Sequence, residues 1–321
     1  LRLRPTSPSG DDGTMFGKLF GSKESKKAPE PTRKVKAPPV PRMKRVNLAR
    51  RFTVLAETSQ GSMSHVSKAL DNEQQRSVCL KVQNATKTAE ALSRASRDGR
   101  PPEGAIGAKI RHPNVVLTFD YGLSTKKEHW LSMEFIEGVS LNEIRKIGAR
   151  DLTGKVGLLI QAAEGLDAIH RAGFIHHDFG PKNVLVNREN VVKIIDFGLA
   201  VPDEPHFHRP GNRTGTLQYM APELIRREAT DRRIDTFSFG VMAFELLSNR
   251  LPYEMAGDQM AMIRARMNAD PLRLADVAPS LPTDLCAVVD RCLARRKEDR
   301  YSSMAQVAEE LKALSVAPKH E

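Results

Sequence analysis

The strongest constraint on the fold is a change in hydrophobic pattern along the chain. Short runs rich in Val, Thr and aromatic residues come first. They predict strands over residues 51–57, 77–83, 114–122 and 129–136. Longer runs with helical spacing come later. They predict helices over residues 151–173, 235–249 and 303–314. This segregation indicates an α+β fold in which a crevice separates a strand-rich lobe from a larger helix-rich lobe.

The net charge of +11 is concentrated at the N-terminus. Residues 1–50 carry 13 Lys and Arg against 4 Asp and Glu, together with 7 of the 20 prolines. Such a composition predicts a disordered tail. Two readings of the tail remain open: a solvated linker, or a tether whose Phe16, Leu19 and Phe20 contact an anionic membrane surface or an acidic partner weakly. Met15 is the expected start residue. The basic segment lies in no folded motif, so sequence-specific binding to nucleic acid is not expected.

Targeting features and cysteines indicate where the protein works. No apolar run approaches the roughly 18–20 residues of a membrane helix, and no secretory leader pattern precedes the strands. The three cysteines, Cys79, Cys286 and Cys292, form no CxxC pair. This usage is typical of a reducing compartment, and we expect a cytoplasmic protein.

Two short segments carry residues suited to phosphoryl transfer from ATP. The segment "HHDFGPKN" holds Asp178 and Asn183, and "IIDFGLA" holds Asp196. Such transfer needs a cation on the phosphates, oxygen ligands for Mg²⁺ and a group that accepts the hydroxyl proton. Lys81, on the strand predicted over 77–83, is the candidate cation. The sequence therefore predicts an ATP- and Mg²⁺-dependent phosphotransferase.

These segments, with "RHPNVVLTFDYG", "LSMEFIEGVSL" and "GTLQYMAPE", resemble the bacterial form of the eukaryotic-like protein serine/threonine kinase family. The resemblance covers residues 51–315. It implies a bilobal protein-kinase-like fold with an N-lobe over about 51–136 and a C-lobe over about 137–315, followed by a C-terminal tail over 316–321. The implied substrates are proteins with Ser or Thr acceptors.

The resemblance also implies roles for individual residues. Asp178 is the expected base, bonded by Thr216, while Asn183 and Asp196 hold Mg²⁺. Met133 is the expected gatekeeper, and residues Glu134 to Ile136 form the hinge that reads adenine. Further nucleotide-binding residues are Val66, Cys79 and Leu185 around the base and Lys81 on the phosphates. Structural pairs are expected between Glu223 and Arg300 and between Asp235 and the catalytic loop.

Two parts of the N-lobe depart from the family pattern. The loop "SQGSMSHV" keeps only Gly61 of three glycines, with Ser59 and Ser64 in the other positions, so weakened ATP binding is expected. Spacing favours Glu103 as the partner of Lys81, and Glu90 is the competing candidate. The prolines and glycines around Glu103 predict a short or mobile helix.

Two positions of the catalytic loop also depart from the pattern. His177 replaces an arginine that in the family binds a phosphate on the activation loop. A largely neutral histidine is a poor phosphate clamp, so we expect activity without phosphorylation of Thr214. Gly180 replaces a lysine beside the γ-phosphate. Two roles remain open for Lys182: it supplies this charge in the transition state, or it is an exposed lysine.

Three functions fit this pattern. An active protein serine/threonine kinase is favoured by retention of Asp178, Asn183 and Asp196. A pseudokinase scaffold that binds nucleotide is suggested by Gly180 and by the altered glycine loop. A small-molecule phosphotransferase on the same fold is disfavoured by the segment "GTLQYMAPE", which builds a peptide-docking lobe in the family.

Overall fold

The computed structural model describes residues 45–60, 64–84, 98–148, 150–210, 214–253 and 259–314, without the side chains of residues 58–60 and 259. All of them belong to the compact unit Met43–Glu321. Gly61, Glu90, the tail as far as residue 44 and the segment from residue 315 onward lie outside the described residues. Among the described helices, none is both long and apolar enough to cross a membrane.

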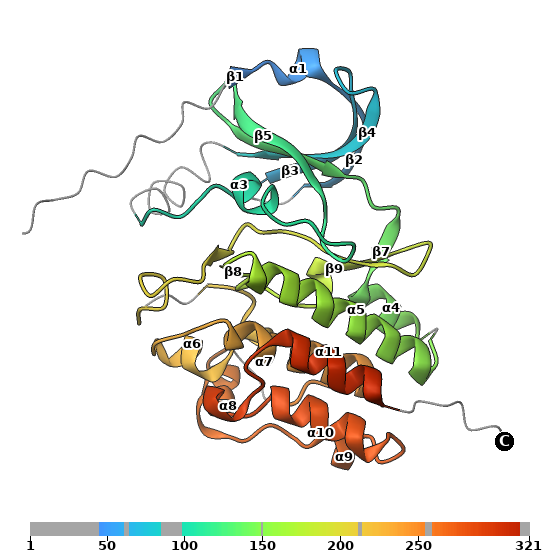
Figure 1. Cartoon of the computed structure of the whole chain (residues 1–321), viewed down its shortest axis with the longest axis vertical. Coiled ribbons are helices and arrows are strands. Elements are labelled where there is room, and N and C mark those ends of the chain that lie inside the picture. Colours follow the sequence, from blue (N-terminus) through green and yellow to red (C-terminus); the bar gives the residue numbers. More distant parts are fainter. Residues whose placement is uncertain are drawn as a thin grey trace, which may run out of the picture. The chain divides into compact units, whose positions relative to one another are not determined.

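The strand-rich part is a six-stranded sheet in the order β1-β5-β6-β4-β3-β2 (Figure 1). β1 runs parallel to β5, and the other neighbours are antiparallel. The bounds are β1 Arg45–Val46, β2 Phe52–Gln60, β3 Ser64–Asp71, β4 Arg76–Gln83, β5 Thr118–Ser124 and β6 His129–Glu134. Three predicted strands are confirmed as β2, β4 and β6. The strand predicted over 114–122 begins later, at Thr118, and β3 was not predicted.

The sequence placed the boundary of the tail too late. Residues 45–50, which we assigned to the disordered tail, form β1 and most of helix α1, Leu48–Arg51. Val46 and Leu48 pack against an apolar cluster of the sheet. The Arg51 guanidinium lies 3.1 Å from Asp71 and 2.6 Å from Asp120. The prediction was wrong here because a composition averaged over 50 residues hides a few anchoring side chains.

The two faces of the sheet pack against different parts of the protein. Val66 pairs with Lys81 across β3 and β4, and Cys79 pairs with Met133 across β4 and β6. Because paired residues share a face and side chains alternate along a strand, these four side chains lie on one face. The other face carries the separate apolar cluster that residues 45–52 cover: Phe52, Ala69, Val78, Leu80 and Trp130. The sheet therefore presents Lys81 on the face that joins the main core.

Helix α3, Glu103–Gly107, is only five residues long, as the surrounding prolines and glycines led us to expect. The structure adds a second reason for its glycines. A Cβ atom on Gly104 would lie 2.3 Å from Cβ of Tyr121, and one on Gly107 would lie 2.3 Å from Oγ1 of Thr118. Such distances are far inside van der Waals contact, so these glycines let α3 pack directly against β5.

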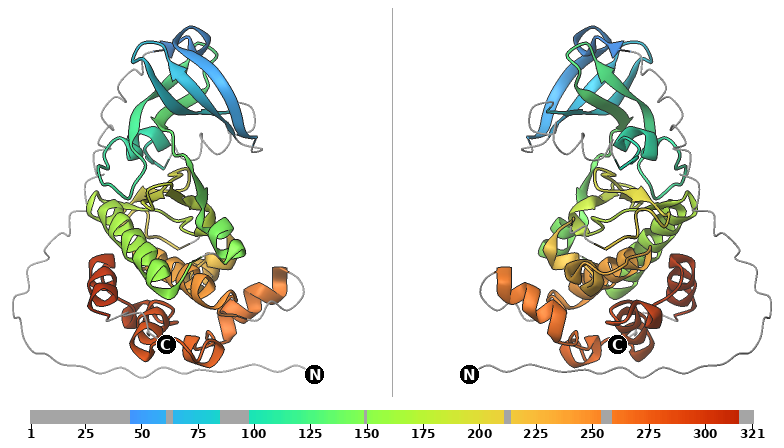
Figure 2. Two further views of the ribbon diagram at one scale, coloured as in Figure 1. Left: turned by 90° about the vertical axis from the view of Figure 1, so that its right-hand side faces the viewer. Right: turned by 90° about the vertical axis from the view of Figure 1, so that its left-hand side faces the viewer.

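The helical part is built around α7, which is almost completely buried on all sides. The predicted helices are confirmed as α5, α7 and α11. Figure 2 shows α8 and α11 on opposite sides of this part. The bounds are α4 Leu141–Ile147, α5 Leu152–Arg171, α6 Pro222–Arg226, α7 Arg233–Ser248, α8 Gln259–Asn268, α9 Leu274–Val277, α10 Thr283–Cys292 and α11 Met304–Ala313.

Short strands frame the segments that carry the candidate chemistry. One sheet has the order β10-β9-β7, and a second pairs β11 with β8. The bounds are β7 Gly138–Ser140, β8 Phe174–Ile175, β9 Val184–Asn187, β10 Val192–Ile194 and β11 Val201–Pro202. The loop with Asp178 connects β8 to β9, and Asp196 follows β10. Both segments therefore begin where a short strand ends.

A predicted ion pair and a helix cap can be located in the helical part. The Arg300 guanidinium binds both carboxylate oxygens of Glu223, at 2.7 and 2.9 Å, and both side chains are buried. Ser303 caps α11 by accepting from the amide of Gln306. The Gln306 side chain accepts from the amide of Ser302 at 3.2 Å.

Candidate active site

The loop of residues 176–183 is anchored by the side chain of Asp235, which lies on α7. The carboxylate of Asp235 accepts from the amides of His176 and His177, at 2.7 and 2.9 Å, and lies 2.9 Å from Nε2 of His170. Burial opposes ionisation, but the bond from His170 and the neighbouring histidines outweigh it, so the pKa of Asp235 lies below its ordinary value. The predicted contact of Asp235 with this loop is present.

Asp178 is surrounded by donors from three directions. Its Oδ1 accepts from the amide and the hydroxyl of Thr216, each at 2.8 Å. Its Oδ2 accepts from the amide group of Asn183 at 3.2 Å and lies 3.1 Å from the ammonium of Lys182. The three predicted catalytic residues, Asp178, Lys182 and Thr216, therefore meet at one carboxylate. A carboxylate held in this way is oriented for a further hydroxyl group that approaches it.

Lys81 connects the sheet, α3 and the segment after β10. Its Nζ atom lies 2.8 Å from Oε1 of Glu103 and 2.9 Å from Oδ1 of Asp196. The other oxygen of Glu103 accepts from Gln83 at 3.2 Å. Burial alone would lower the pKa of Lys81, but the two carboxylates outweigh it and raise this pKa above its ordinary value. The charge of Lys81 is therefore permanent at neutral pH.

Asp196 and Asn183 are held close together by the backbone. The amide of Ile195 donates to the carbonyl of Asn183 at 2.9 Å. Asp196 has a left-handed backbone with φ of +67°, and its Oδ1 accepts from the amide of Gly198 at 3.0 Å. Burial opposes ionisation of Asp196, but Lys81 and the amide of Gly198 outweigh it and hold its pKa below the ordinary value. Its side chain is nevertheless 43 % exposed.

This pair fits a magnesium ion. The side-chain nitrogen of Asn183 faces Asp178, which leaves its oxygen free to bind a cation. The Oδ2 atom of Asp196 accepts no hydrogen bond from the described residues. The described residues contain no group of three or more His, Cys, Asp or Glu side chains suited to a metal. Mg²⁺ commonly takes only one or two protein oxygens beside substrate phosphates and water, so a sparse donor set suits it.

The predicted adenine-binding residues come from both parts of the fold. Val66 and Cys79 lie on β3 and β4, whereas Leu185 lies on β9. Burial raises the pKa of the Cys79 thiol to about 11, so this side chain is a neutral apolar group rather than a reactive one. Met133 and Glu134 end β6, and Ile136 follows. Ser59 lies at the end of β2, but its side chain and the whole of Gly61 fall outside the described residues.

Glu134 is tied down by its side chain. Its carboxylate accepts from the amide of Leu117 and lies 2.8 Å from the ammonium of Lys193. Its own amide donates to the carbonyl of Leu117 at 2.9 Å. The start of the segment predicted as the hinge is therefore fixed to Leu117, just before β5, and to Lys193 of β10.

His177 occupies a strained and buried position. Its φ is +66°, and among the described residues neither ring nitrogen has a hydrogen-bond partner. Burial lowers the pKa of His177 to about 4, so the ring is uncharged at neutral pH. Gly215 packs against the backbone of His177, since a Cβ atom on Gly215 would lie 2.6 Å from the His177 carbonyl oxygen. The ring therefore has neither the charge nor the exposure of a phosphate clamp.

Gly180 lies within this loop, against Tyr219. Its backbone is extended, and a Cβ atom there would meet the ring of Tyr219 at 3.3 Å. A side chain at this position is thus tolerated after a shift of a few tenths of an ångström. Lys182 lies in the following turn and is 55 % exposed, although it reaches Asp178. The only cations within 4 Å of Asp178 and Asp196 in the described structure are Lys182 and Lys81.

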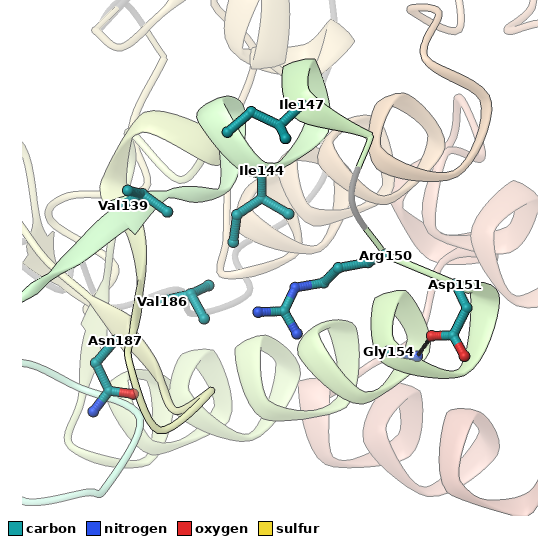
Figure 3. A pocket seen from close by; sticks show the side chains of 8 residues that line it. All are labelled: Val139, Ile144, Ile147, Arg150, Asp151, Gly154, Val186 and Asn187. Carbon is teal, nitrogen blue, oxygen red and sulfur yellow. Dashed lines mark hydrogen bonds between the residues drawn. The ribbon is translucent and has the colours of Figure 1, made fainter.

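A separate hollow of about 600 Å³ lies among α4, β7, β9 and the start of α5 (Figure 3). Val139, Ile144, Ile147 and Val186 form its apolar wall, and the Arg150 side chain points into it. Arg150 already donates to Asn190 at 2.6 Å. None of the candidate catalytic or nucleotide-binding residues lines this hollow, so it is not part of the site.

Two functional contacts were missed in the sequence. Arg100, three residues before Glu103, donates to the carbonyl of Gly198 beside Asp196. His170, near the end of α5, supports Asp235. Helical spacing alone marks His170 as a residue of the core face. No sequence signal marks Arg100, because it precedes a Pro-Pro pair and lies in no predicted element.

Comparison with known proteins agrees with this geometry. A family model described as the protein kinase domain matches residues 52–312. The probable serine/threonine-protein kinase pknA2 of Bifidobacterium longum is 29 % identical over 83 % of this chain and 35 % of the relative. The serine/threonine-protein kinase PknE of Mycobacterium tuberculosis is 31 % identical over 75 % of this chain and 42 % of the relative.

A third relative, the serine/threonine-protein kinase PknL of Mycobacterium bovis, is 31 % identical over 83 % of this chain and 66 % of its own length. The chain thus spans less than half the length of the first two relatives. The family model, in contrast, matches almost all of the described fold, including every candidate residue from Ser59 to Thr216. The chain belongs to the protein kinase family.

Proposed function

We propose that this protein transfers the γ-phosphate of Mg-ATP to serine or threonine hydroxyls of protein substrates. One observation carries the proposal: Asp178 is oriented by Thr216 while Lys81 joins Glu103 to Asp196. The first contact prepares a base, and the second prepares a phosphate-binding cation beside a metal ligand. Phosphoryl transfer needs both at once.

The chemical step follows from the position of Asp178. A substrate hydroxyl that approaches Oδ2 gives its proton to Asp178, and its oxygen forms a bond to the γ-phosphorus. The bond from that phosphorus to the β–γ bridging oxygen breaks, and ADP leaves. Thr216 keeps the other carboxylate oxygen occupied through two bonds of 2.8 Å, so the carboxylate stays turned toward the hydroxyl.

Lys81 is proposed to bind the phosphates of ATP, and Asn183 and Asp196 are proposed to hold Mg²⁺. When bound, Mg²⁺ neutralises developing charge on the phosphate oxygens. Glu103 keeps Lys81 directed toward the phosphates. In this structure Lys81 also contacts Asp196 directly. Nucleotide binding therefore rearranges the contacts of Lys81 rather than creating its position.

Lys182 is proposed to supply the transition-state charge that Gly180 cannot. Its ammonium already lies 3.1 Å from Asp178, so a small movement of a flexible side chain brings it to the transferring phosphoryl group. Movement away from Asp178 also frees Oδ2 for the substrate hydroxyl. The exposed side chain of Lys182 and the lack of a side chain at Gly180 support this role.

The adenine site is proposed to comprise Val66, Cys79, Met133, Glu134, Ile136 and Leu185, with Ser59 and Gly61 over the phosphates. The register that places Val66, Cys79 and Met133 on the face of Lys81 supports this assignment. We propose an N-lobe over about 51–136, enlarged by residues 45–50, and a C-lobe over about 137–315. A cytoplasmic location and weak contacts of the basic tail stay predictions.

The test uses three matched peptide pools whose acceptor position is Ser/Thr, Tyr or Ala, each incubated with the protein, Mg²⁺ and ATP. Mass spectrometry is expected to detect phosphate on the Ser/Thr pool, and none when Asp178→Asn replaces the wild-type protein. If the protein binds ATP but transfers phosphate neither to a peptide pool nor to small hydroxyl compounds, the pseudokinase is favoured. Transfer only to small hydroxyl compounds would favour the small-molecule phosphotransferase.

A further inference from the structure

The segment Asp196–Gly198 is held from α3 as well as from Lys81. A Cβ atom on Gly198 would lie only 3.7 Å from Oε2 of Glu103, so this turn packs directly beside the start of α3. The Gly198 amide donates to Asp196, while its carbonyl oxygen accepts from Arg100. The amide and the carbonyl of Gly198 therefore both form hydrogen bonds that fix the turn, and this turn carries the proposed metal ligand Asp196.

Arg100 is placed for this contact by its own surroundings. Its guanidinium is partly buried and lies close enough to Glu103 and Asp196 to be attracted by both carboxylates. Together with Lys81 it makes a cluster of two cations and two anions. Charge-assisted bonds in a partly buried cluster are stronger than those on the surface, and a guanidinium keeps its charge throughout the physiological range.

The usual alternative for ordering this region is a phosphate on the activation segment, bound by a cation of the catalytic loop. That cation is absent at His177. His177 is only 6 % exposed, and burial holds its pKa at about 4. In the described structure Lys81 contacts both Glu103 and Asp196.

We propose that Arg100 is a positioning residue that holds the Asp196–Gly198 turn against α3 and so keeps the magnesium-binding carboxylate in place without phosphorylation of the activation segment. The inference rests on the proposed function and adds to it. It assigns to Arg100 the ordering role that a phosphorylated loop and its clamp perform elsewhere. The role follows from contact with the backbone of Gly198 and not from contact with substrate.

The experiment compares Arg100→Met and Arg100→Lys with phosphatase-treated wild-type protein. Mg²⁺ is titrated at fixed ATP, and binding is measured by the ATP-induced rise in melting temperature as well as by peptide phosphorylation. Arg100→Met is expected to raise the Mg²⁺ concentration for half-maximal effect about tenfold or more, because a charge-assisted bond is lost. Arg100→Lys is expected to recover part of this loss.

The matched control is Arg76→Met, which removes an arginine that stacks on Phe119, with its guanidinium carbon 3.5 Å from the ring centroid, and has no contact with the turn. This variant is expected to keep the wild-type Mg²⁺ dependence. If Arg100→Met also keeps it, the proposal is overturned. It is equally overturned if phosphorylation of Thr214 activates the wild type and this activation requires Arg100, because Arg100 would then be a phosphate receptor.

Measuring ATP binding separately from phosphate transfer distinguishes failure of the proposed function from failure of the role proposed for Arg100. If the wild type transfers no phosphate to any peptide, the proposed function fails, yet the Mg²⁺ dependence of ATP binding still decides the role of Arg100. If Arg100→Met does not fold, Arg100→Lys and Arg100→Gln give the same comparison with smaller losses of packing. Wild-type Mg²⁺ dependence in all folded variants would overturn the proposal.

Discussion

The catalytic loop and the Lys81 cluster are held in place by different means. The loop around Asp178 is anchored by Asp235, which is completely buried and accepts hydrogen bonds from two backbone amides of the loop. The cluster of Lys81, Glu103 and Asp196 instead joins a strand, a five-residue helix and a turn through side-chain ion pairs. One region is fixed by the core of the helical part, and the other depends on how three separate elements meet.

The difference separates two functions. Asp178 keeps its orientation whenever the helical part is folded, so the proposed base does not depend on the packing of α3. Lys81 and Asp196, which are proposed to bind Mg-ATP, keep theirs only when α3 packs closely on β5, which its glycines allow. We therefore expect substitution of Asp178 to reduce the rate of transfer, and substitution of Lys81, Glu103 or Asp196 to reduce the binding of Mg-ATP.

The largest expected effect is on the anchor of the loop. Asp235→Asn removes a buried charge that three donors require, and about 3–5 kcal/mol of unfolding free energy should be lost. Chemical denaturation measures this loss. Asp231→Asn is the matched control, since Asp231 is a partly exposed partner of Arg233. Equal losses in the two variants would show that Asp235 does not anchor the loop in the way described.

The next effect concerns the charge near the phosphoryl group. Lys182→Ala should lower kcat roughly a hundredfold or more while the Kd for ATP stays unchanged. Adding Gly180→Lys to this variant should restore much of kcat, because the extended backbone there tolerates a side chain. An unchanged kcat in Lys182→Ala would show that Lys182 is only an exposed lysine. If only the KM for the peptide rises and kcat is unchanged, Lys182 acts in binding of the peptide substrate.

A smaller effect is expected on stability in acid. The pKa of His177 is about 4 in the folded protein and ordinarily 6.5. Between these two pH values His177 is protonated in the unfolded chain but neutral in the folded protein. Stability is therefore lost as the pH falls from 6.5 toward 4. Between pH 7 and pH 5 the loss from this group should be roughly 2 kcal/mol.

Denaturation of wild type and His177→Asn at both pH values measures that contribution. Asparagine tolerates the left-handed backbone of this position and does not titrate. The variant should lose less stability in acid than the wild type does. Identical losses would mean that His177 does not carry the acid sensitivity of the loop.

The smallest effect is expected at the activation segment. Because His177 cannot clamp a phosphate, Thr214→Ala should change kcat by no more than about a factor of two, as a surface substitution does. Steady-state phosphorylation of the Ser/Thr peptide pool provides the measurement. Loss of all activity in a folded Thr214→Ala variant would contradict the independence from phosphorylation.

The sequence predicted the parts whose signals are local. Apolar periodicity located α5, α7 and α11, and short motifs with fixed spacing located Asp178, Asn183 and Asp196. The spacing that favoured Glu103 agrees with the ion pair that the structure shows. Glu90 falls outside the described residues and is not compared. These features were readable because each depends on a few neighbouring positions in the chain.

Other features depend on residues far apart and left no readable pattern. β3 was missed because its Ser, His and Lys side chains weaken the strand signal. Gly104 and Gly107 indicated only a poor helix, since nothing in the sequence shows that Tyr121 and Thr118 lie against them. The bond from Arg100 to Gly198 joins positions 98 residues apart and likewise has no local signal.

The most direct test of the separation between the two regions is calorimetry of Mg-ATP binding to Asp178→Asn, paired with its rate of transfer to the Ser/Thr peptide pool. We predict the wild-type Kd together with a rate reduced at least about a hundredfold, as expected on loss of a general base. A wild-type rate would show that Asp178 is not the base. A strongly weakened Kd would show that the loop and the Lys81 cluster form one unit.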